Sequence, residues 1–294
     1  MAESKRKNRG GLSSYRSGFS IGAFLRERCP FLFDWQSVFY FGVSIVVIGF
    51  LFMAAGLLYN IFSSAYNWDY SHQYLPFAYD YRDTWITFFS TGKFPLYDPL
   101  VFIGNDNIGA NAYYGLFDPF IILLAFFPRS WIPQMFAIFT VVKLLICALG
   151  ARAYLKYLGI REWTARFGAL AMAFSGYFAF MVGFPSFVSA LAYVPLVLLG
   201  IEKTIAEGKI GYLVLGLFMI EVSCFLLLVP MCIWGVIYAL WRFFLTVRRR
   251  SGAENVRAML LGVSGFALGL MLGMFMLLPS LRQSSLTGRA NSIG

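Results

Sequence analysis

The chain has 294 residues, of which 59% are hydrophobic and 13% charged, with a net charge of +10 and a mean hydropathy of +0.69. Because charged residues make up about a quarter of an ordinary soluble domain, this composition excludes a soluble globular protein and predicts an all-α polytopic membrane protein. The basic residues lie beside hydrophobic segments, where membrane topology and anionic lipid account for them, so we expect membrane lipid and not nucleic acid as a partner.

Residues 1–34 are rich in Lys, Arg, Ser and Gly, and we expect them to form a basic cytoplasmic tail held near anionic lipid. The hydrophobic segment at 35–59 is long enough to cross a membrane as a helix. The polar stretch SSYRSGFS separates it from the basic start, and no small-residue cleavage site precedes the following loop, so we do not expect a cleavable signal peptide. We expect it to remain as the first transmembrane helix.

Residues 60–132 are predicted to form a loop with juxtamembrane helices on one side of the membrane. Residues 60–115 contain no Glu and only Arg82 and Lys93 as basic residues. They carry these aspartates: Asp69, Asp80, Asp83, Asp98 and Asp106. The apolar piece at 116–127 is too short to cross a membrane, and prolines bound it, so we expect an interfacial or re-entrant segment.

Residues 133–279 are predicted to form a bundle of six transmembrane helices. Apolar spans lie at 133–154, 166–182, 187–199 and 256–278. The stretch at 210–245 would be about 54 Å long as one helix, against a hydrocarbon core of about 30 Å. We therefore expect two spans there, joined by a hairpin near Val229 and Pro230.

The distribution of basic residues sets the predicted orientation of these seven spans. If 116–127 does not cross, the N-terminal lysines and arginines and the run at 248–250 fall on one side, which the positive-inside rule assigns to the cytoplasm. The aspartate-rich loop and the tail at 280–294 are then extracytoplasmic. The basic residues left outside are Arg82, Lys93, Arg129, Arg282 and Arg289.

No P-loop GxxxxGK[ST] and no HExxH motif is present, so any chemistry must use carboxylates. Lys143 and Glu221 lie inside predicted spans, where ionisable groups are costly and commonly functional. Two interpretations stay open for them: they pair across the bundle, or they contact a ligand.

Short motifs along the chain resemble one known family. Asp69 follows the first span, and QYLPF (73–77), Arg82, FPLYDP (94–99) and YYGLFDPF (113–120) come after it. AFSGYF (173–178) and LLPSLRQSS (277–285) lie downstream. Together they resemble the YfhO family of bacterial membrane proteins over nearly all of the chain beyond residue 34.

The resemblance implies a glycosyltransferase C-type (GT-C) fold, of which this chain would be the N-terminal seven-span module. Two features depart from the family. SCFLLLVP (223–230) lacks the polar, tyrosine-rich turn expected at that hairpin. YfhO-like proteins are also usually longer, with more spans and an extracytoplasmic domain, so the part that shapes acceptor recognition is expected to be absent here or on another polypeptide.

The resemblance further implies a function at the bacterial plasma membrane. A sugar would pass from a polyprenyl-phosphate-linked donor to an extracytoplasmic cell-envelope acceptor, for example teichoic or lipoteichoic acid, with a second glycosylation-system protein as a further candidate partner. Asp69 would be the catalytic base, and Arg82 would hold the departing phosphate. The other expected site residues are His72, Gln73, Tyr74, Arg129 and Arg282 for donor or substrate binding, and Asp80, Asp83 and Asp106 as secondary carboxylates. A divalent cation, Mg²⁺ or Mn²⁺, if used, would be held by Asp69, Asp80 and Asp83.

Simpler interpretations stand beside each assignment. Asp69 has the position of a helix N-cap, Asp80 and Asp83 have the spacing of a solvated helix face, and NDN at 105–107 has turn chemistry. The aromatic residues of the loop suit an interfacial belt as well as sugar stacking; they are Trp68, Tyr70, Tyr74, Tyr79, Tyr81 and Trp85. For the whole chain the alternatives are a non-catalytic partner or fragment of a glycosylation complex, or a flippase or transporter for a lipid-linked sugar.

Overall fold

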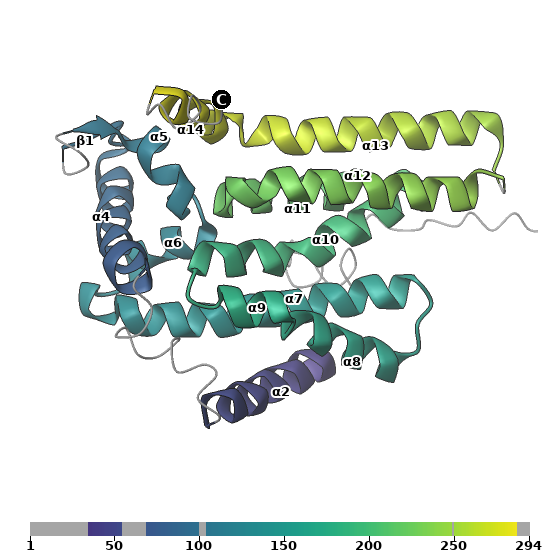
Figure 1. Cartoon of the computed structure of the whole chain (residues 1–294), viewed down its shortest axis with the longest axis horizontal. Coiled ribbons are helices and arrows are strands. Elements are labelled where there is room, and N and C mark those ends of the chain that lie inside the picture. The colour runs from purple at the N-terminus through teal and green to yellow at the C-terminus, as the bar shows by residue number, and fades with distance from the viewer. Residues whose placement is uncertain (1–34, 55–68, 100–103, 249, 287–294) are drawn as a thin grey trace, which may run out of the picture.

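The computed structural model describes residues 35–54, 69–99, 104–248 and 250–286, and these form an almost entirely helical molecule (Figure 1). Long helices run side by side along the long axis, and a layer of shorter elements lies across one end of them. The predicted tails at 1–34 and 287–294 and the stretch at 55–68 lie outside the described residues.

The bundle follows the predicted spans in order, but the third predicted span, at 166–182, is broken after Ala173 and continues from Gly176. Its helices are α2 (Trp35–Ala54), α7 (Ile132–Tyr157), α8 (Glu162–Ala173), α9 (Gly176–Met181), α10 (Pro185–Glu207), α11 (Gly211–Ser223), α12 (Phe225–Val247) and α13 (Gly252–Leu272). Among the described residues, four helices are long and apolar enough to cross a membrane, namely Arg129–Tyr157, which contains α7, and α10, α12 and α13. The apolar parts of α2 and α11 are shorter. The all-α polytopic membrane class is therefore confirmed, whereas the number of seven crossings stays a prediction.

Helix α10 is the centre of the bundle. In its most apolar stretch 78% of the residues are buried inside the protein, compared with 11% in that of α12 and 17% in that of α13. Two glycines let α10 and α11 approach closely. A Cβ added at Gly200 would lie 2.3 Å from the backbone nitrogen of Leu213, and one at Gly216 would lie 2.9 Å from that of Val197. Small residues at helix contacts allow such close approach within membranes. The outer faces of α12 and α13 remain apolar and exposed, as lipid-facing helices require.

The hairpin between the fifth and sixth predicted spans turns earlier than we expected. The break lies at Cys224, whose backbone is extended (φ −161°, ψ 86°), and not at Val229 and Pro230. The Cys224 amide closes α11 by donating to the Ile220 carbonyl at 2.8 Å, and Pro230 lies inside α12. A proline is tolerated in a membrane helix because its neighbours satisfy the freed carbonyl, so proline position alone was a poor guide to the turn.

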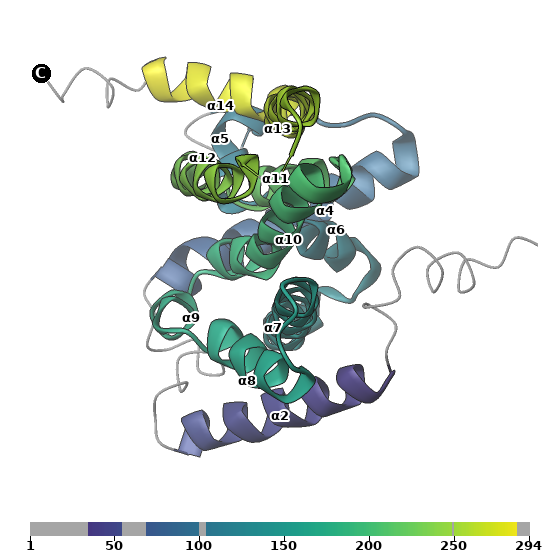
Figure 2. The same cartoon turned by 90° about the vertical axis from the view of Figure 1, so that its right-hand side faces the viewer.

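The last predicted span is also divided. Helix α13 ends at Leu272, and after Gly273 the chain turns into α14 (Met274–Leu286), which leaves the axis of α13 (Figure 2). Residues 280–286 are therefore helical and do not form an extended tail. Helix α14 packs on α5 (Asn107–Asn111) in the end layer, where a Cβ added at Gly109 would lie 3.0 Å from the Pro279 carbonyl.

The end layer is built from short elements. They are η1 (Tyr70–Tyr74), α4 (Leu75–Thr91), the strands β1 (Tyr97–Asp98) and β2 (Asn105–Asp106), α5, η2 (Ala112–Tyr114), α6 (Pro119–Leu123), η3 (Leu124–Phe126) and η4 (Arg129–Trp131). The two strands pair antiparallel, with Tyr97 opposite Asp106. Helix α4 crosses the end of the bundle and does not run along it (Figure 1). The predicted helix is therefore present, and its position beside the membrane stays a prediction.

The apolar piece at 116–127 does not form a straight span. The helical pieces Asn107–Tyr114 and Pro119–Phe126 meet at 102°, the geometry of a broken span or a re-entrant loop. Leu116 and Leu124 are fully buried in the layer.

The aromatic residues of the loop pack inside the protein. Tyr70, Tyr74, Tyr81 and Trp85 are at most 8% exposed. The three tyrosines belong to a hydrophobic cluster with residues of α6 and α7, and the Trp85 ring contacts Phe117 at the edge of that cluster. The Trp85 indole donates to the Leu116 carbonyl at 2.8 Å. For these four residues, both the interfacial belt and the sugar-stacking surface are wrong. The polar groups of Tyr74, Tyr81 and Trp85 have hydrogen-bond partners, which allows their rings to be buried. Trp68 lies outside the described residues.

Candidate functional site

Asp69 stands at the start of the helical run that leads into α4. Its backbone is already helical (φ −65°, ψ −38°), and its side chain makes no capping hydrogen bond. Instead Oδ1 accepts a hydrogen bond from Gln73 Nε2 at 3.1 Å, and Tyr114 donates to the other end of the same amide at 2.9 Å. The N-cap interpretation of Asp69 is therefore not what the structure shows. A part-buried carboxylate is held in one orientation by Gln73, which Tyr114 holds in turn.

The two other polar residues of this turn differ in exposure. His72 is exposed, with its Nδ1 2.8 Å from Ser71 Oγ. Tyr74 is buried, its hydroxyl lies 3.1 Å from Ser186 Oγ, and burial raises its pKa. Tyr74 therefore stays protonated near neutral pH and links η1 to α10. His72, one turn after Asp69, is the basic side chain that the sequence places nearest to that carboxylate.

Arg82, Asp83 and Arg129 form an ion-pair group on α4 and η4. Asp83 accepts from Arg82 at 3.0 Å through one oxygen and from Arg129 at 2.9 Å through the other. Arg82 Nε also donates to the Phe127 carbonyl at 2.9 Å, and the Arg129 guanidinium lies over the Tyr79 ring. Asp83 is thus not a free solvated carboxylate, and both guanidinium groups already have a partner.

Asp80 lies one turn before Asp83 and is hydrogen-bonded to the side chain of Asp98 on β1. Burial, the nearby negative charge of Asp98 and this hydrogen bond raise the pKa of Asp80 to about 6, while Arg129 opposes the shift. Asp98 is 6% exposed and accepts from Asn111 Nδ2 at 3.3 Å. Two carboxyl groups that share one proton near neutral pH are a recognised form of acid–base site.

The NDN segment at 105–107 has a local structural role. Asp106 caps α5 by accepting from the amides of Ile108 at 3.3 Å and Gly109 at 2.9 Å. Asn107 Nδ2 donates to the Pro95 carbonyl at 2.8 Å. The turn interpretation is therefore confirmed, and Asp106 is occupied by the helix start.

Arg282, expected in an outer tail, lies exposed on α14. Because α14 packs on α5, it is at the same end of the molecule as the other candidates.

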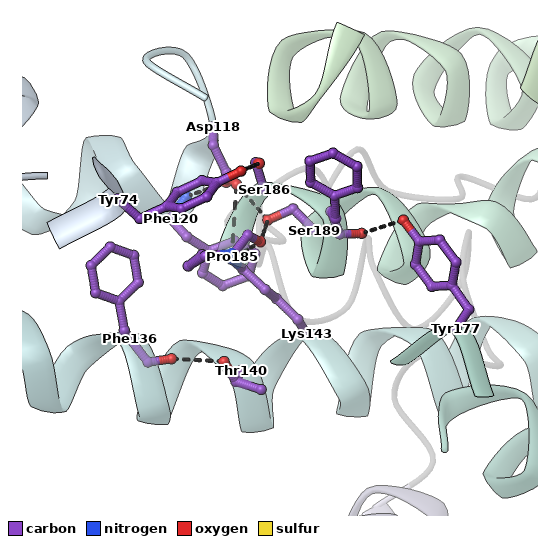
Figure 3. Close-up of polar contacts among 11 residues, drawn as sticks. Tyr74, Asp118, Phe120, Phe136, Thr140, Lys143, Tyr177, Pro185, Ser186 and Ser189 are labelled. Atoms are coloured by element: carbon purple, nitrogen blue, oxygen red, sulfur yellow. Dashed lines mark hydrogen bonds and ion pairs between the residues drawn. The ribbon is translucent and has the colours of Figure 1, made fainter. Parts of the chain in front are cut away.

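A buried polar cluster joins the end layer to the bundle beneath it (Figure 3). Lys143 extends from α7 toward Asp118 and the Pro185 carbonyl, with Nζ 3.9 Å from Asp118 Oδ2 and 3.0 Å from the carbonyl oxygen. Ser189 donates to Asp118, and the Phe120 amide donates to it at 2.9 Å. Burial raises the pKa of Asp118, and Lys143, Ser189 and Phe120 oppose the shift. The aspartate is both a helix cap and the counter-ion of Lys143.

The suggested pair of Lys143 and Glu221 is wrong. Glu221 lies on α11 and is fully buried, and neither of its oxygens has a hydrogen-bond partner of ordinary geometry among the described residues. Its carboxyl group lies directly against Gly273, where an added Cβ would be 2.0 Å from Glu221 Cδ.

The sequence did not predict that Asp98 interacts with Asp80 or that Asp118 interacts with Lys143. Asp98 and Asp118 both precede a proline, in LYDP and LFDP, which is typical of a turn or a helix start. The available signal was Lys143, a charge inside a span that needs a counter-ion, but the sequence did not indicate which aspartate supplied it.

The predicted metal site and the predicted pairing of Asp69 with Arg82 do not match the geometry of the described residues. No group of three or more His, Cys, Asp or Glu side chains suited to a metal ion occurs among the described residues, so Asp69, Asp80 and Asp83 do not gather in such a set. Asp69 and Arg82 are joined by a continuous helical run, and at about 1.5 Å per residue they are about 20 Å apart along it. A base and a phosphate-binding cation at a single reacting centre must lie closer together than that.

The comparisons with known proteins identify the family. No curated protein and no solved structure matches the chain. The family described as bacterial membrane protein YfhO matches residues 40–293, which is most of the sequence and includes every candidate residue above. The chain is a membrane protein of the YfhO family.

Proposed function

We propose that this chain transfers a sugar from a polyprenyl-phosphate-linked donor to an acceptor of the cell envelope, at the end of the bundle that α4 covers. The orientation of Asp69 is the observation that supports this most. A part-buried carboxylate, free of any capping role and fixed by Gln73 and Tyr114, is suited to take a proton in one direction.

In this reaction the oxygen of an acceptor hydroxyl attacks the anomeric carbon of the donor sugar. The new carbon–oxygen bond forms as the bond between that carbon and the lipid phosphate breaks. Asp69 takes the hydroxyl proton, and the phosphate leaves with the bonding electron pair. The leaving phosphate needs a cation near Asp69. Arg82 lies about 20 Å along the helix, so His72, the nearest basic side chain in sequence, is the candidate to donate a ring N–H to the phosphate.

A second centre has a specific observation in its favour. Asp80 and Asp98 share a hydrogen bond, the pKa of Asp80 is about 6, and Arg129 interacts electrostatically with Asp80. A proton acceptor and a guanidinium group are therefore already together at this centre. Because Asp80 lies on α4, this pair could act as the base for the same donor and acceptor if Asp69 does not.

The orientation of the protein is part of the proposal. Helix α4 and the aspartates lie at one end of the bundle, and the connections after α7, α10 and α12 lie at the other (Figure 1). Lys156, Arg161, Lys209, Arg248 and Arg250 are on or beside those connections. We assign that basic end to the cytoplasm and the α4 end to the outside of the plasma membrane.

The test compares three isosteric variants expressed in cells, with membrane insertion and abundance measured for each. Asp69→Asn should lower sugar transfer to surface polymer at least about a hundredfold, because a general base contributes roughly 10²–10⁴ in rate. Asp106→Asn is the matched control: it removes a carboxylate from the same end but keeps the α5 cap, so transfer should not change.

Asp80→Asn separates the two centres. Loss of transfer in Asp80→Asn with normal transfer in Asp69→Asn would move the base to the pair of Asp80 and Asp98. Unchanged transfer in both variants, or no transfer by the wild-type chain, would contradict catalysis by either carboxylate and favour a non-catalytic partner in a glycosylation complex.

A further inference from the structure

The end of the bundle opposite α4 contains two adjoining hollows, one on each side of Arg250. The larger, of about 290 Å³, lies among the ends of α7, α10 and α12. The smaller, of about 140 Å³, lies between the end of α10 and the start of α13. The polar residues that line them are Tyr157, Glu202, Arg242 and Thr246 in the first, Thr204, Glu207, Glu254 and Arg257 in the second, and Arg250 in both.

The carboxylates around these hollows are already engaged. Glu202 accepts from Arg242 through both oxygens, with Arg242 Nη2 2.8 Å from Oε2. Glu207 pairs with Lys209 at 2.8 Å. Glu254 completes a capping box with Ser251, whose amide donates to Oε2 at 2.9 Å. Glu202 and Glu207 are therefore each paired with another cation, whereas Glu254, held by Ser251, also interacts electrostatically with Arg250.

Arg250 and Arg257 form no ion pair with any residue that the structure describes. Both line the smaller hollow, and Arg250 lines the larger one as well. The Arg257 guanidinium lies beside Gly208, where an added Cβ would come within 3.3 Å of it. Two guanidinium groups that form no ion pair with a described residue therefore face one small polar space. Guanidinium groups bind phosphate through pairs of N–H donors.

An apolar hollow continues from this polar space along α13. It shares Arg257 and Leu261 with the smaller hollow and is otherwise lined by Gly252, Ala253, Val256 and Leu260, with a volume of about 530 Å³. Val256 is 52% exposed and Leu260 is 59% exposed, on a helix that is mostly not covered by protein. A ligand that fills both spaces has an anionic head and a hydrocarbon chain.

We propose that this is a binding site for an anionic phospholipid. Its phosphate lies between Arg250 and Arg257, and one acyl chain lies along Val256 and Leu260. The site is at the basic end of the bundle, far from α4, and does not depend on the proposed glycosyl transfer. The apolar hollow distinguishes a lipid from free phosphate, because inorganic phosphate has nothing to place there. Basic pockets between membrane helices are common sites for anionic head groups.

The experiment uses the full chain, purified in a neutral detergent, with lipid binding measured by native mass spectrometry. Dioleoylphosphatidylglycerol should bind at least about fivefold more tightly than dioleoylphosphatidylcholine. Arg250→Gln and Arg257→Gln should each weaken phosphatidylglycerol binding by about fivefold, since one basic residue near a membrane surface contributes about 1 kcal/mol. Arg161→Gln removes a positive charge from the same end but outside the hollows, so it should leave the affinity unchanged.

Inorganic phosphate and a variant of the apolar hollow distinguish a lipid site from a simple anion site. Thermal stabilisation by inorganic phosphate equal to that by phosphatidylglycerol would overturn the lipid assignment and leave an anion site. Leu260→Asn keeps both arginines and should weaken phosphatidylglycerol binding without changing the response to phosphate. Equal affinity for the two lipids, or equal loss of affinity in Arg161→Gln and the two pocket variants, would overturn the site.

Discussion

Asp118 and Lys143 lie inside the protein with their charged groups 3.9 Å apart and their residues 1% and 2% exposed. The first belongs to the short helical layer and the second to the long helix α7. Ser189 of α10 also donates to Asp118. One buried ion pair therefore fixes the layer that carries the candidate catalytic carboxylates to the two most central helices of the bundle.

Removing one partner of this pair should lower the free energy of unfolding much more than removing both partners does. Lys143→Met leaves the Asp118 carboxylate buried without its counter-ion, so the free energy of unfolding should fall by about 3–5 kcal/mol. Asp118→Asn keeps an oxygen to cap α6. The loss of unfolding free energy in the double variant should be clearly smaller than the sum of the losses in the two single variants. Equilibrium unfolding in mixed detergent micelles measures this cycle, and strictly additive losses would contradict a direct coupling.

The sequence predicted most of the bundle, because a hydrophobic segment of sufficient length has few alternatives to a membrane helix. It was less informative where a break depends on tertiary contacts. The turn at Cys224 and the bend at Gly273 lie within long apolar stretches that contain no run of turn-forming residues. Pro230 suggested a turn, yet it lies within α12.

For the candidate site, the sequence identified the aspartate-rich loop but could not predict how its side chains pair. The pairs of Asp80 with Asp98 and Asp118 with Lys143 join residues far apart in the chain, and no local spacing encodes them. The tyrosines near Asp69 suggested an exposed surface by composition. Both Tyr70 and Tyr74 are buried, and the Tyr74 hydroxyl has Ser186 as a partner, which only the folded chain brings near.

Glu221 and Gly273 should show a steric coupling. Gly273→Ala places a methyl group 2.0 Å from Glu221 Cδ, although the backbone angle of Gly273 (φ −94°) suits alanine. The single variant should therefore lower the unfolding temperature, and Glu221→Ala should restore part of the loss by removing the atoms that clash. Thermal unfolding of the purified single and double variants in detergent measures this. Gly262→Ala is the matched control, since nothing lies within 4 Å of its added Cβ.

The pair of Asp80 and Asp98 should make stability depend on pH. Burial and Asp98 raise the pKa of Asp80 from 3.8 to about 6, so the folded chain binds this proton more tightly than the unfolded chain does. Its contribution to stability is present below about pH 4 and is lost as the pH rises through 6. The wild-type unfolding temperature should fall across this window more steeply than that of Asp80→Asn, whose side chain stays neutral.

Asp98→Asn tests the cause of the shift. Without the neighbouring negative charge the pKa of Asp80 should move down toward its ordinary value. The pH range over which the unfolding temperature falls should then end at a lower pH than in the wild type. Thermal unfolding between pH 4 and pH 7 follows both variants. Identical pH profiles for the wild type, Asp80→Asn and Asp98→Asn would contradict a shared proton.

Asp83 should restrain anion binding by Arg82 and Arg129. It holds both guanidinium groups at about 3 Å, and the side chains of Asp83 and Arg129 are 47% and 62% exposed. Such exposed pairs contribute roughly 0–1 kcal/mol each, so Asp83→Asn should cost little stability. The released guanidinium groups should then bind farnesyl phosphate up to about fivefold more tightly, as measured by isothermal titration. Arg129→Gln in the Asp83→Asn background should reverse the gain. Weaker binding by Asp83→Asn alone would instead mean that Asp83 positions the two arginines for phosphate, which would make Asp83 a positioning residue of the second centre.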